Sequence, residues 1–107
     1  MVKFKQLFQF KQKEIKEAFE KATLKDKILG LKLLQAPSDK DFGKLLIVIP
    51  AKTGTAYKRN KIRRQIKAIF YEENLFKKAT NSILFVYKQS LNLTFEQIKG
   101  FLIKNLK

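Results

Sequence analysis

A chain of 107 residues can enclose one hydrophobic core but not two, so we expect a single domain spanning residues 1–107. Its 24 lysines and arginines against 9 acidic residues give a net charge of +15, which points to a polyanionic partner: nucleic acid first, an anionic membrane surface second. The absence of histidine and cysteine excludes disulfides, thiol nucleophiles, imidazole bases and the common zinc-ligand sets.

The first predicted element is a helix over residues 12–22. Apolar side chains recur there at helical spacing, with charged residues between them: Ile15, Ala18, Phe19 and Ala22. Phe8 and Phe10, just before it, are expected to pack against this helix and the sheet. The N-terminus lacks the apolar core of a signal peptide, and no apolar run approaches the roughly 20 residues of a membrane span. We therefore expect a cytoplasmic protein without a membrane partner.

Two short apolar segments follow, at residues 28–34 and 44–49. Polar residues between them, 36–43, include proline, aspartate and glycine and are typical of a turn region. We predict that the two segments are strands paired antiparallel to one another. Because their apolar runs are nearly continuous, we expect burial on both faces.

The next element is a helix capped by Thr55 and running to about Asn74. With about 100° per residue, one stripe of this helix is apolar and is expected to face the core: Ile62, Ile66, Ile69 and Phe70. The opposite stripe is polar and is expected to face solvent: Asn60, Arg64, Lys67 and Tyr71. The helix thus has an apolar back and a basic front.

A further strand is predicted at residues 82–88, and the helix before it makes a β-α-β unit that suits parallel pairing with the strand at 44–49. Residues 94–97 resemble a capping box and open a last helix. Its inward-facing side chains are predicted to be Phe95, Ile98, Phe101, Leu102 and Leu106. The element order α-β-β-α-β-α predicts an α+β fold in which helices pack on a small mixed sheet.

The sequence nominates no catalytic residue and no metal ligand. The carboxylate pair with metal-like spacing, Asp39 and Asp41, lies in a turn sequence where aspartates commonly bond to local backbone. A serine or threonine nucleophile would need a base, and without histidine no residue stands out for that role. A self-sufficient active site is therefore not expected.

The arginines are confined to one place. All three lie within six consecutive residues, Arg59, Arg63 and Arg64, and no acidic residue occurs between Asp41 and Glu72. An ordinary solvated helix face carries charges of both signs, whereas arginine presents a planar fork of donors suited to phosphates and base edges. The glycine-containing loop at residues 52–55 adds a phosphate seat at the start of the helix. Nucleic-acid binding is the better interpretation.

Residues 52–67 read Lys-x-Gly-x-Ala-x-x-Arg-Asn-Lys-x-Arg-Arg-x-x-Lys, and Phe70, Glu72 and Glu73 follow. This segment resembles the signature of the bacterial ribonuclease P protein subunit, closely over residues 44–73 and by pattern outside them. The resemblance implies an accessory subunit of an endoribonuclease whose RNA subunit performs the catalysis with Mg2+. It also implies two RNA partners, the catalytic RNA subunit and the 5′ leader of precursor tRNA, and no required protein partner.

The resemblance also implies roles for particular residues. The expected RNA-binding side chains are Lys52, Lys58, Arg59, Asn60, Lys61, Arg63, Arg64 and Lys67. The expected lining of a leader cleft between the first helix and the sheet is Ile15, Phe19 and Lys32. Ile15 and Lys32 stand where the family often has aromatic residues, which weakens base stacking but keeps phosphate attraction. A short extra strand near residues 24–27 and a left-handed β-α-β crossover are implied as well.

Two other functions are compatible with charge and size. One is a ribosomal or general RNA-binding protein without a role in cleavage. The other is a DNA-binding module that places the basic helix in a major groove, although a strand at residues 44–50 stands where such modules have a second short helix.

Overall fold

The computed structural model describes residues 2–107. Within that range the chain forms three α-helices and a four-stranded mixed sheet, which confirms the predicted α+β class. The elements are α1 (Gln12–Lys21), β1 (Thr23–Ile28), β2 (Leu31–Pro37), β3 (Leu45–Val48), α2 (Ala56–Glu72), β4 (Thr80–Val86) and α3 (Phe95–Leu106). Short 3-10 helices lie at η1 (Phe4–Leu7), η2 (Ala51–Thr53), η3 (Leu75–Lys77) and η4 (Lys88–Asn92).

The strands lie in the order β1-β2-β4-β3. β4 pairs antiparallel with β2 along its whole length, from Val86 opposite Leu31 to Thr80 opposite Pro37, and it pairs in parallel with β3. The parallel β3–α2–β4 unit is confirmed. The predicted direct pairing of segments 28–34 and 44–49 is wrong, because β4 lies between them and takes a hydrogen-bonding edge of each.

The apolar segment 28–34 is a strand end, a turn and the start of another strand. β1 ends at Ile28, Leu29 and Gly30 form the turn, and β2 begins at Leu31. Gly30 has φ +91°, a backbone conformation that favours glycine, and a side chain there would overlap the backbone of η4. The extra strand implied near residues 24–27 is therefore present as β1, and the last strand ends at residue 86 rather than 88.

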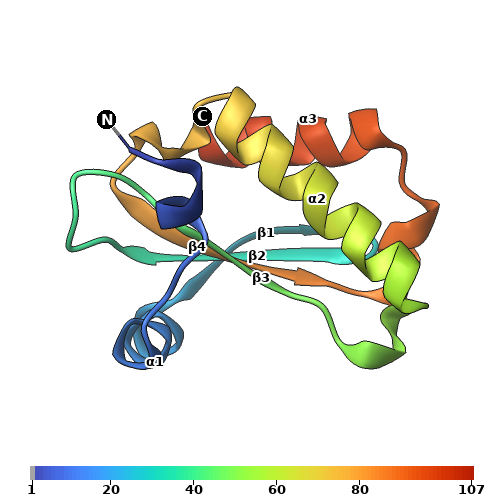
Figure 1. The fold of residues 1–107 in the computed structure, drawn as a ribbon, viewed down its shortest axis with the longest axis horizontal. Helices are drawn as coiled ribbons and strands as arrows, with labels where there is room; N and C mark the ends of the chain where they lie inside the picture. Colours follow the sequence, from blue (N-terminus) through green and yellow to red (C-terminus); the bar gives the residue numbers. More distant parts are fainter. Residues whose placement is uncertain (1) are drawn as a thin grey trace.

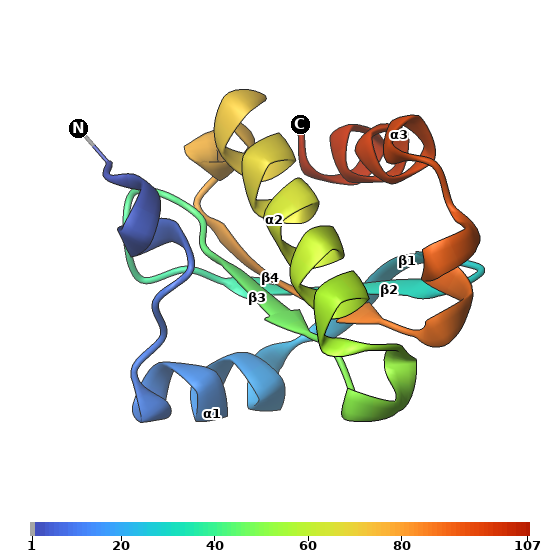
Figure 2. The same cartoon turned by 45° about the vertical axis from the view of Figure 1, so that its right-hand side comes forward.

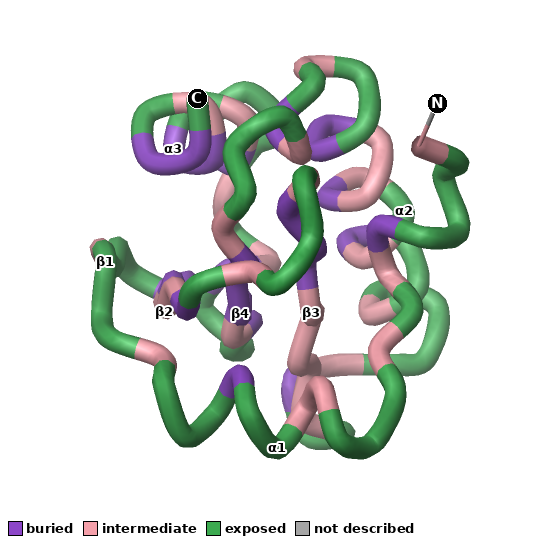
Figure 3. Tube along the Cα trace, turned by 90° about the vertical axis from the view of Figure 1, so that its left-hand side faces the viewer, coloured by how far each residue is buried: buried purple, intermediate pink, exposed green. Residues whose placement is uncertain are grey.

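The sheet separates two unequal layers (Figures 1 and 2): α2 and α3 cover one face, and α1 lies across one end of the other. The main core fills the space between the sheet and α2 and α3. The apolar stripe predicted on α2 is buried throughout, at Ile62, Ile66, Ile69 and Phe70. On α3 the prediction is also confirmed, except that Phe95 is 38% exposed. Figure 3 shows the buried positions concentrated toward α2 and α3, whereas the trace of α1 is largely exposed.

α1 is fastened to the start of β3 by a charged contact. The ammonium group of Lys44 donates to a carboxylate oxygen of Glu14 at 2.8 Å and to the carbonyl oxygen of Gln9 at 2.7 Å. It also lies 5.2 Å from the ring centroid of Phe10. Phe8 packs instead against Phe70 of α2, with 5.7 Å between ring centroids. Both rings thus have structural neighbours, although the partner of Phe8 is α2 rather than α1.

Candidate nucleic-acid interface

The start of α2 concentrates positive charge at the positive end of a helix dipole. The Thr55 hydroxyl accepts a hydrogen bond from the backbone N–H of Lys58 at 3.3 Å, which confirms the predicted cap. No acidic residue occupies the first turn, which instead carries Lys58 and Arg59. Cations at this end of a helix are unfavourable in the free protein. A bound phosphate would offset both the dipole and the side-chain charge.

The loop before α2 is held rigidly against the end of β4. The Thr53 hydroxyl is buried and donates to the carbonyl oxygen of Val86 at 3.2 Å. Gly54 lies so close to Leu91 of η4 that a Cβ at position 54 would approach that side chain to 2.9 Å. Lys52 stays exposed in this loop. The loop therefore presents its lysine from a fixed backbone.

The basic residues of α2 lie on three sides of the helix rather than in one stripe. Stepping about 100° per residue from Ile62, the first set falls near 60° to 140° on the side of η1: Arg59, Arg63 and Lys67. Asn60 and Arg64 point outward and are exposed. Lys58 and Lys61 fall on the opposite side, where they line a pocket with η4 and α3. The basic surface thus wraps around the helix.

Local contacts set how available each side chain is. One guanidinium nitrogen of Arg63 donates to the side-chain oxygen of Asn60 at 2.7 Å, which orients both groups at the surface. Lys67, predicted to be exposed, is half-buried, with its ammonium 5.2 Å from the ring centroid of Phe8. The Nε atom of Arg59 is buried without a hydrogen-bond partner among residues 2–107. Arg59 therefore retains an unused donor beside the core.

The sheet face on the side of α1 is partly open and carries aromatic rings. Phe19 of α1 meets Phe85 of β4 at a centroid distance of 6.2 Å, and Phe85 stacks on Tyr87 at 6.3 Å with an interplanar angle of 10°. Lys32 pairs with Phe85 across the β2–β4 ladder, so both point to this face. We call Phe19, Lys32, Phe85 and Tyr87 the open sheet face.

The exposures of these side chains fit a binding surface better than a core. Phe19 is 46% exposed and Tyr87 39% exposed, whereas Lys32 and Phe85 are intermediate. Ile15, also expected here, is intermediate in exposure. Phe85 and Tyr87 were not among the residues predicted from the sequence, because residues 82–88 were predicted only as a strand, with no role assigned to either face. Their signal was the alternation of Phe85 and Tyr87 with Val86, which places both rings on one face.

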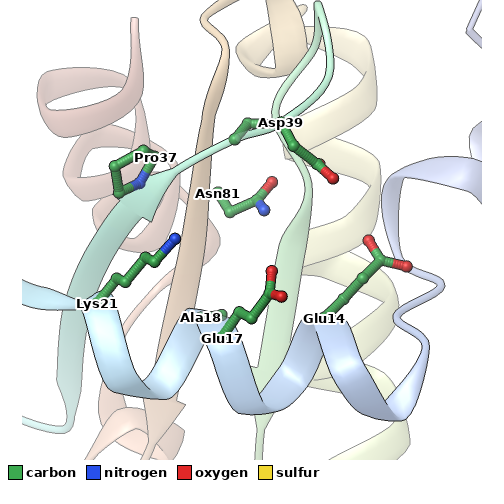
Figure 4. Close-up of a pocket in the computed structure, with 8 residues that line it drawn as sticks. Glu14, Glu17, Ala18, Lys21, Pro37, Asp39 and Asn81 are labelled. Atoms are coloured by element: carbon green, nitrogen blue, oxygen red, sulfur yellow. The ribbon is translucent and has the colours of Figure 1, made fainter.

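The other flank of α1 is acidic. A pocket of about 140 Å³ lies there, between α1 and the end of β2. Figure 4 shows Glu14, Glu17 and Lys21 rising from α1 toward Pro37 and Asp39. Glu14 has a lowered pKa, chiefly because its side chain accepts a hydrogen bond from Lys44. Carboxylates repel a polyanion, so this pocket marks a boundary of any nucleic-acid path on the α1 side.

Over residues 2–107 no group of three or more acidic side chains is placed to hold a metal ion. In the turn that contains Asp39 and Asp41, the local bonds come from another residue: the Ser38 hydroxyl donates to the carbonyl oxygen of Phe42 at 2.9 Å and accepts from the N–H of Lys40 at 3.1 Å. None of the described helices has the length and apolar character needed to cross a bilayer.

Comparison with known proteins identifies similar chains. The family model described as Ribonuclease P matches residues 3–107. The Staphylococcus aureus RNase P protein has a similar structure, with a TM-score of 0.79 and 22% identity over 94% of this chain and 92% of that one. The RNase P protein from Thermotoga maritima gives a TM-score of 0.78 and 20% identity over 94% of each chain. No curated protein sequence matches this chain.

Proposed function

Since this chain belongs to the Ribonuclease P family and is thereby the accessory subunit of an endoribonuclease, we propose that it binds the catalytic RNA subunit and the 5′ leader of precursor tRNA. The observation that carries the proposal is the pairing of two surfaces on one rigid sheet. The arginine-bearing helix α2 covers one face of the sheet. The open sheet face lies on the opposite side, next to α1.

We assign the RNA subunit to α2 and the loop before it. The RNA-binding side chains in this assignment are Lys52, Lys58, Arg59, Asn60, Lys61, Arg63, Arg64 and Lys67. The hydrogen bond between Arg63 and Asn60 fixes a forked donor group at the surface, which suits a phosphate or a base edge. Arg59 carries a guanidinium with an unpaired Nε–H, and in this assignment it donates hydrogen bonds to a phosphate oxygen of the RNA.

The leader is assigned to the open sheet face. A single strand binds where rings offer stacking surfaces and cations neutralise phosphates, with little dependence on sequence. Phe19, Phe85 and Tyr87 supply rings there, and Lys32 lies next to Phe85 in the ladder. Ile15 flanks this surface as an apolar wall. In this proposal Phe85 and Tyr87 supply the stacking surface that the family often provides with aromatic residues at positions 15 and 32.

Catalysis in this proposal belongs to the RNA subunit, and the Mg2+ it uses is held by RNA rather than by this chain. The chain contributes positive charge and positioning: by offsetting phosphate repulsion it lets the RNA subunit bind its substrate at a lower Mg2+ concentration. We further propose that residues 1–107 act as a single RNA-binding domain, in the cytoplasm, where precursor tRNA is made.

Reconstitution tests the proposal. The protein is mixed with a bacterial ribonuclease P RNA, and cleavage of precursor tRNA is followed as Mg2+ is varied. We expect the protein to lower the Mg2+ requirement and the protein alone to cleave nothing. We also expect RNA affinity to fall steeply with salt, as it does where phosphate contacts release counterions. Metal-dependent cleavage by purified protein, or a flat salt dependence, would contradict the proposal.

A further inference from the structure

The pocket that Lys58 and Lys61 line with η4 and α3 lies on the α3 side of α2. It has a volume of about 430 Å³, within the range of roughly 300–1,000 Å³ that is usual for small-molecule sites. Its walls come from α2, from η4 and from the start of α3. The lining side chains that matter here are Tyr57, Lys58, Lys61, Gln65, Asn92 and Phe95.

The walls of this pocket are fixed from behind. The Ser90 hydroxyl donates to the carbonyl oxygen of Tyr87 at 2.6 Å, and the Gly30 turn packs directly on the backbone of Ser90. The start of α3 is fixed by its capping box, in which the Thr94 hydroxyl accepts from the N–H of Gln97 at 3.1 Å. The pocket is thus preformed, which reduces the entropy that a ligand loses on binding.

Two aromatic rings in this pocket lack an aromatic neighbour. Tyr57 is 70% exposed and Phe95 is 38% exposed, and neither stacks on another ring within residues 2–107. For Phe95, which helical periodicity assigns to the core, this exposure is a departure that packing does not explain. Exposed rings in a preformed pocket are suited to stack on a planar ligand.

The polar groups around the rings select the class of ligand. Lys58 and Lys61 supply two cations, and no acidic residue is among the lining side chains. Gln65 and Asn92 supply amides that both donate and accept hydrogen bonds. A ligand that combines a flat ring, a hydrogen-bonding edge and adjacent negative charge is a nucleotide.

We propose that this pocket holds one unpaired nucleotide of the RNA partner, with its base against Tyr57 and Phe95 and its phosphates at Lys58 and Lys61. The inference rests on the proposed function, because it requires an RNA bound to α2. It adds a contact that reads an unpaired base on the α3 side of the helix. The leader, on the opposite side of the sheet, takes no part in it.

Paired substitutions test the role of the rings in binding to the ribonuclease P RNA. Tyr57→Leu and Phe95→Leu remove a ring, whereas Tyr57→Phe and Phe95→Tyr keep one at the same position. We expect each leucine variant to bind about tenfold more weakly, as for loss of one stacked base, and the ring-retaining variants to stay within about twofold of wild type. The slope of affinity against salt should not change, because no charge is removed. Urea unfolding confirms that all four variants are folded.

The outcomes separate the two proposals. If wild-type protein does not bind the RNA, both the proposed function and this inference fail. If wild type binds and the leucine variants bind equally well, the pocket assignment alone is overturned. Equal losses in leucine and ring-retaining variants would also overturn it, because stacking would then not be the cause.

A titration with small probes examines the pocket without the large RNA. Adenosine 5′-monophosphate should shift the side-chain amide signals of Gln65 and Asn92 in the NMR spectrum, and inorganic phosphate should not. Tyr57→Leu should reduce the nucleotide response. Equal shifts with both probes would mean that the site attracts anions without holding a base, and the inference would be wrong.

Discussion

Glu14 forms an ion pair with Lys44. Removing the charge of Glu14 should therefore cause a measurable, pH-dependent loss of folding stability. In Glu14→Gln the side chain keeps its shape, and its amide oxygen can still accept the capping hydrogen bond from the N–H of Lys11. What disappears is the negative charge beside the ammonium of Lys44, whose side chain is 7% exposed. Lys44 then retains the carbonyl oxygen of Gln9 as a partner. The substitution therefore removes one of the two charge-assisted hydrogen bonds that the ammonium group of Lys44 donates.

The magnitude follows from that geometry. Hydrogen bonds to charged groups contribute about 1.5–3 kcal/mol, and Glu14 is 19% exposed, so we expect a loss of about 2 kcal/mol in the free energy of unfolding at neutral pH. For a domain of this size such a loss lowers the Tm by on the order of 10 °C. Glu17→Gln, at an exposed acid one turn away, is the matched control and should change stability by less than about 0.5 kcal/mol.

The pH dependence gives the sharper test. The pKa of Glu14 is lowered from its ordinary value of 4.5 in the folded protein, mainly by the hydrogen bond from Lys44. A lowered folded-state pKa contributes stability that is present above the unfolded-state value and is lost as pH falls through the folded-state value. Urea unfolding should thus separate wild type and Glu14→Gln at pH 7, and the difference should shrink only as pH falls below 4.5 and through the lower folded-state pKa. A difference that stays constant with pH would refute the reasoning.

Three further predictions concern binding and folding. Arg64→Ala should weaken RNA binding by about 1–3 kcal/mol, whereas Lys16→Ala, which removes the same charge from the exposed side of α1, should have little effect; equal losses in a filter-binding assay would mean that charge alone matters. Phe19→Leu and Phe85→Leu should each lower the ratio of precursor to mature tRNA affinity, because each removes a stacking ring worth about 1–3 kcal/mol per base; an unchanged ratio would return both rings to a packing role. Gly30→Ala should destabilise the fold by about 3 kcal/mol in urea unfolding, because φ is +91° and a methyl group would meet the Ser90 backbone; wild-type stability would show that the turn adapts.

The sequence predicted what depends on local periodicity and missed what depends on distant partners. α2 was predictable because a capping residue and an apolar stripe at helical spacing lie within one segment. The hairpin turn at Leu29 and Gly30 was not predictable, because Leu29 is apolar although it is 73% exposed, so apolar residues continue on both sides of Gly30. The strand order was missed because no local signal says that β4 enters between β2 and β3.

The same distinction holds for the candidate interface. The motif residues of α2 were found from charge and spacing, but their distribution around three sides of the helix depends on what packs beside it. Lys67 is half-buried because Phe8, far away in the sequence, lies against it. Phe85 and Tyr87 could be assigned to the open sheet face only once α1 was seen to cover one end of the sheet (Figure 1).

The position of β4 has a consequence for the order in which the chain can fold. β3 is synthesised before β4, but β3 pairs with β4. β3 therefore has no strand partner until residues 80–86 have left the ribosome. Until then β1 and β2 can form only a two-stranded hairpin, which is marginally stable in water. A nascent chain that ends before β4 therefore exposes the apolar residues of β2 and β3 together. Exposed apolar surface and unpaired strand edges of this kind favour aggregation, so residues 80–86 must be available before the sheet can be completed.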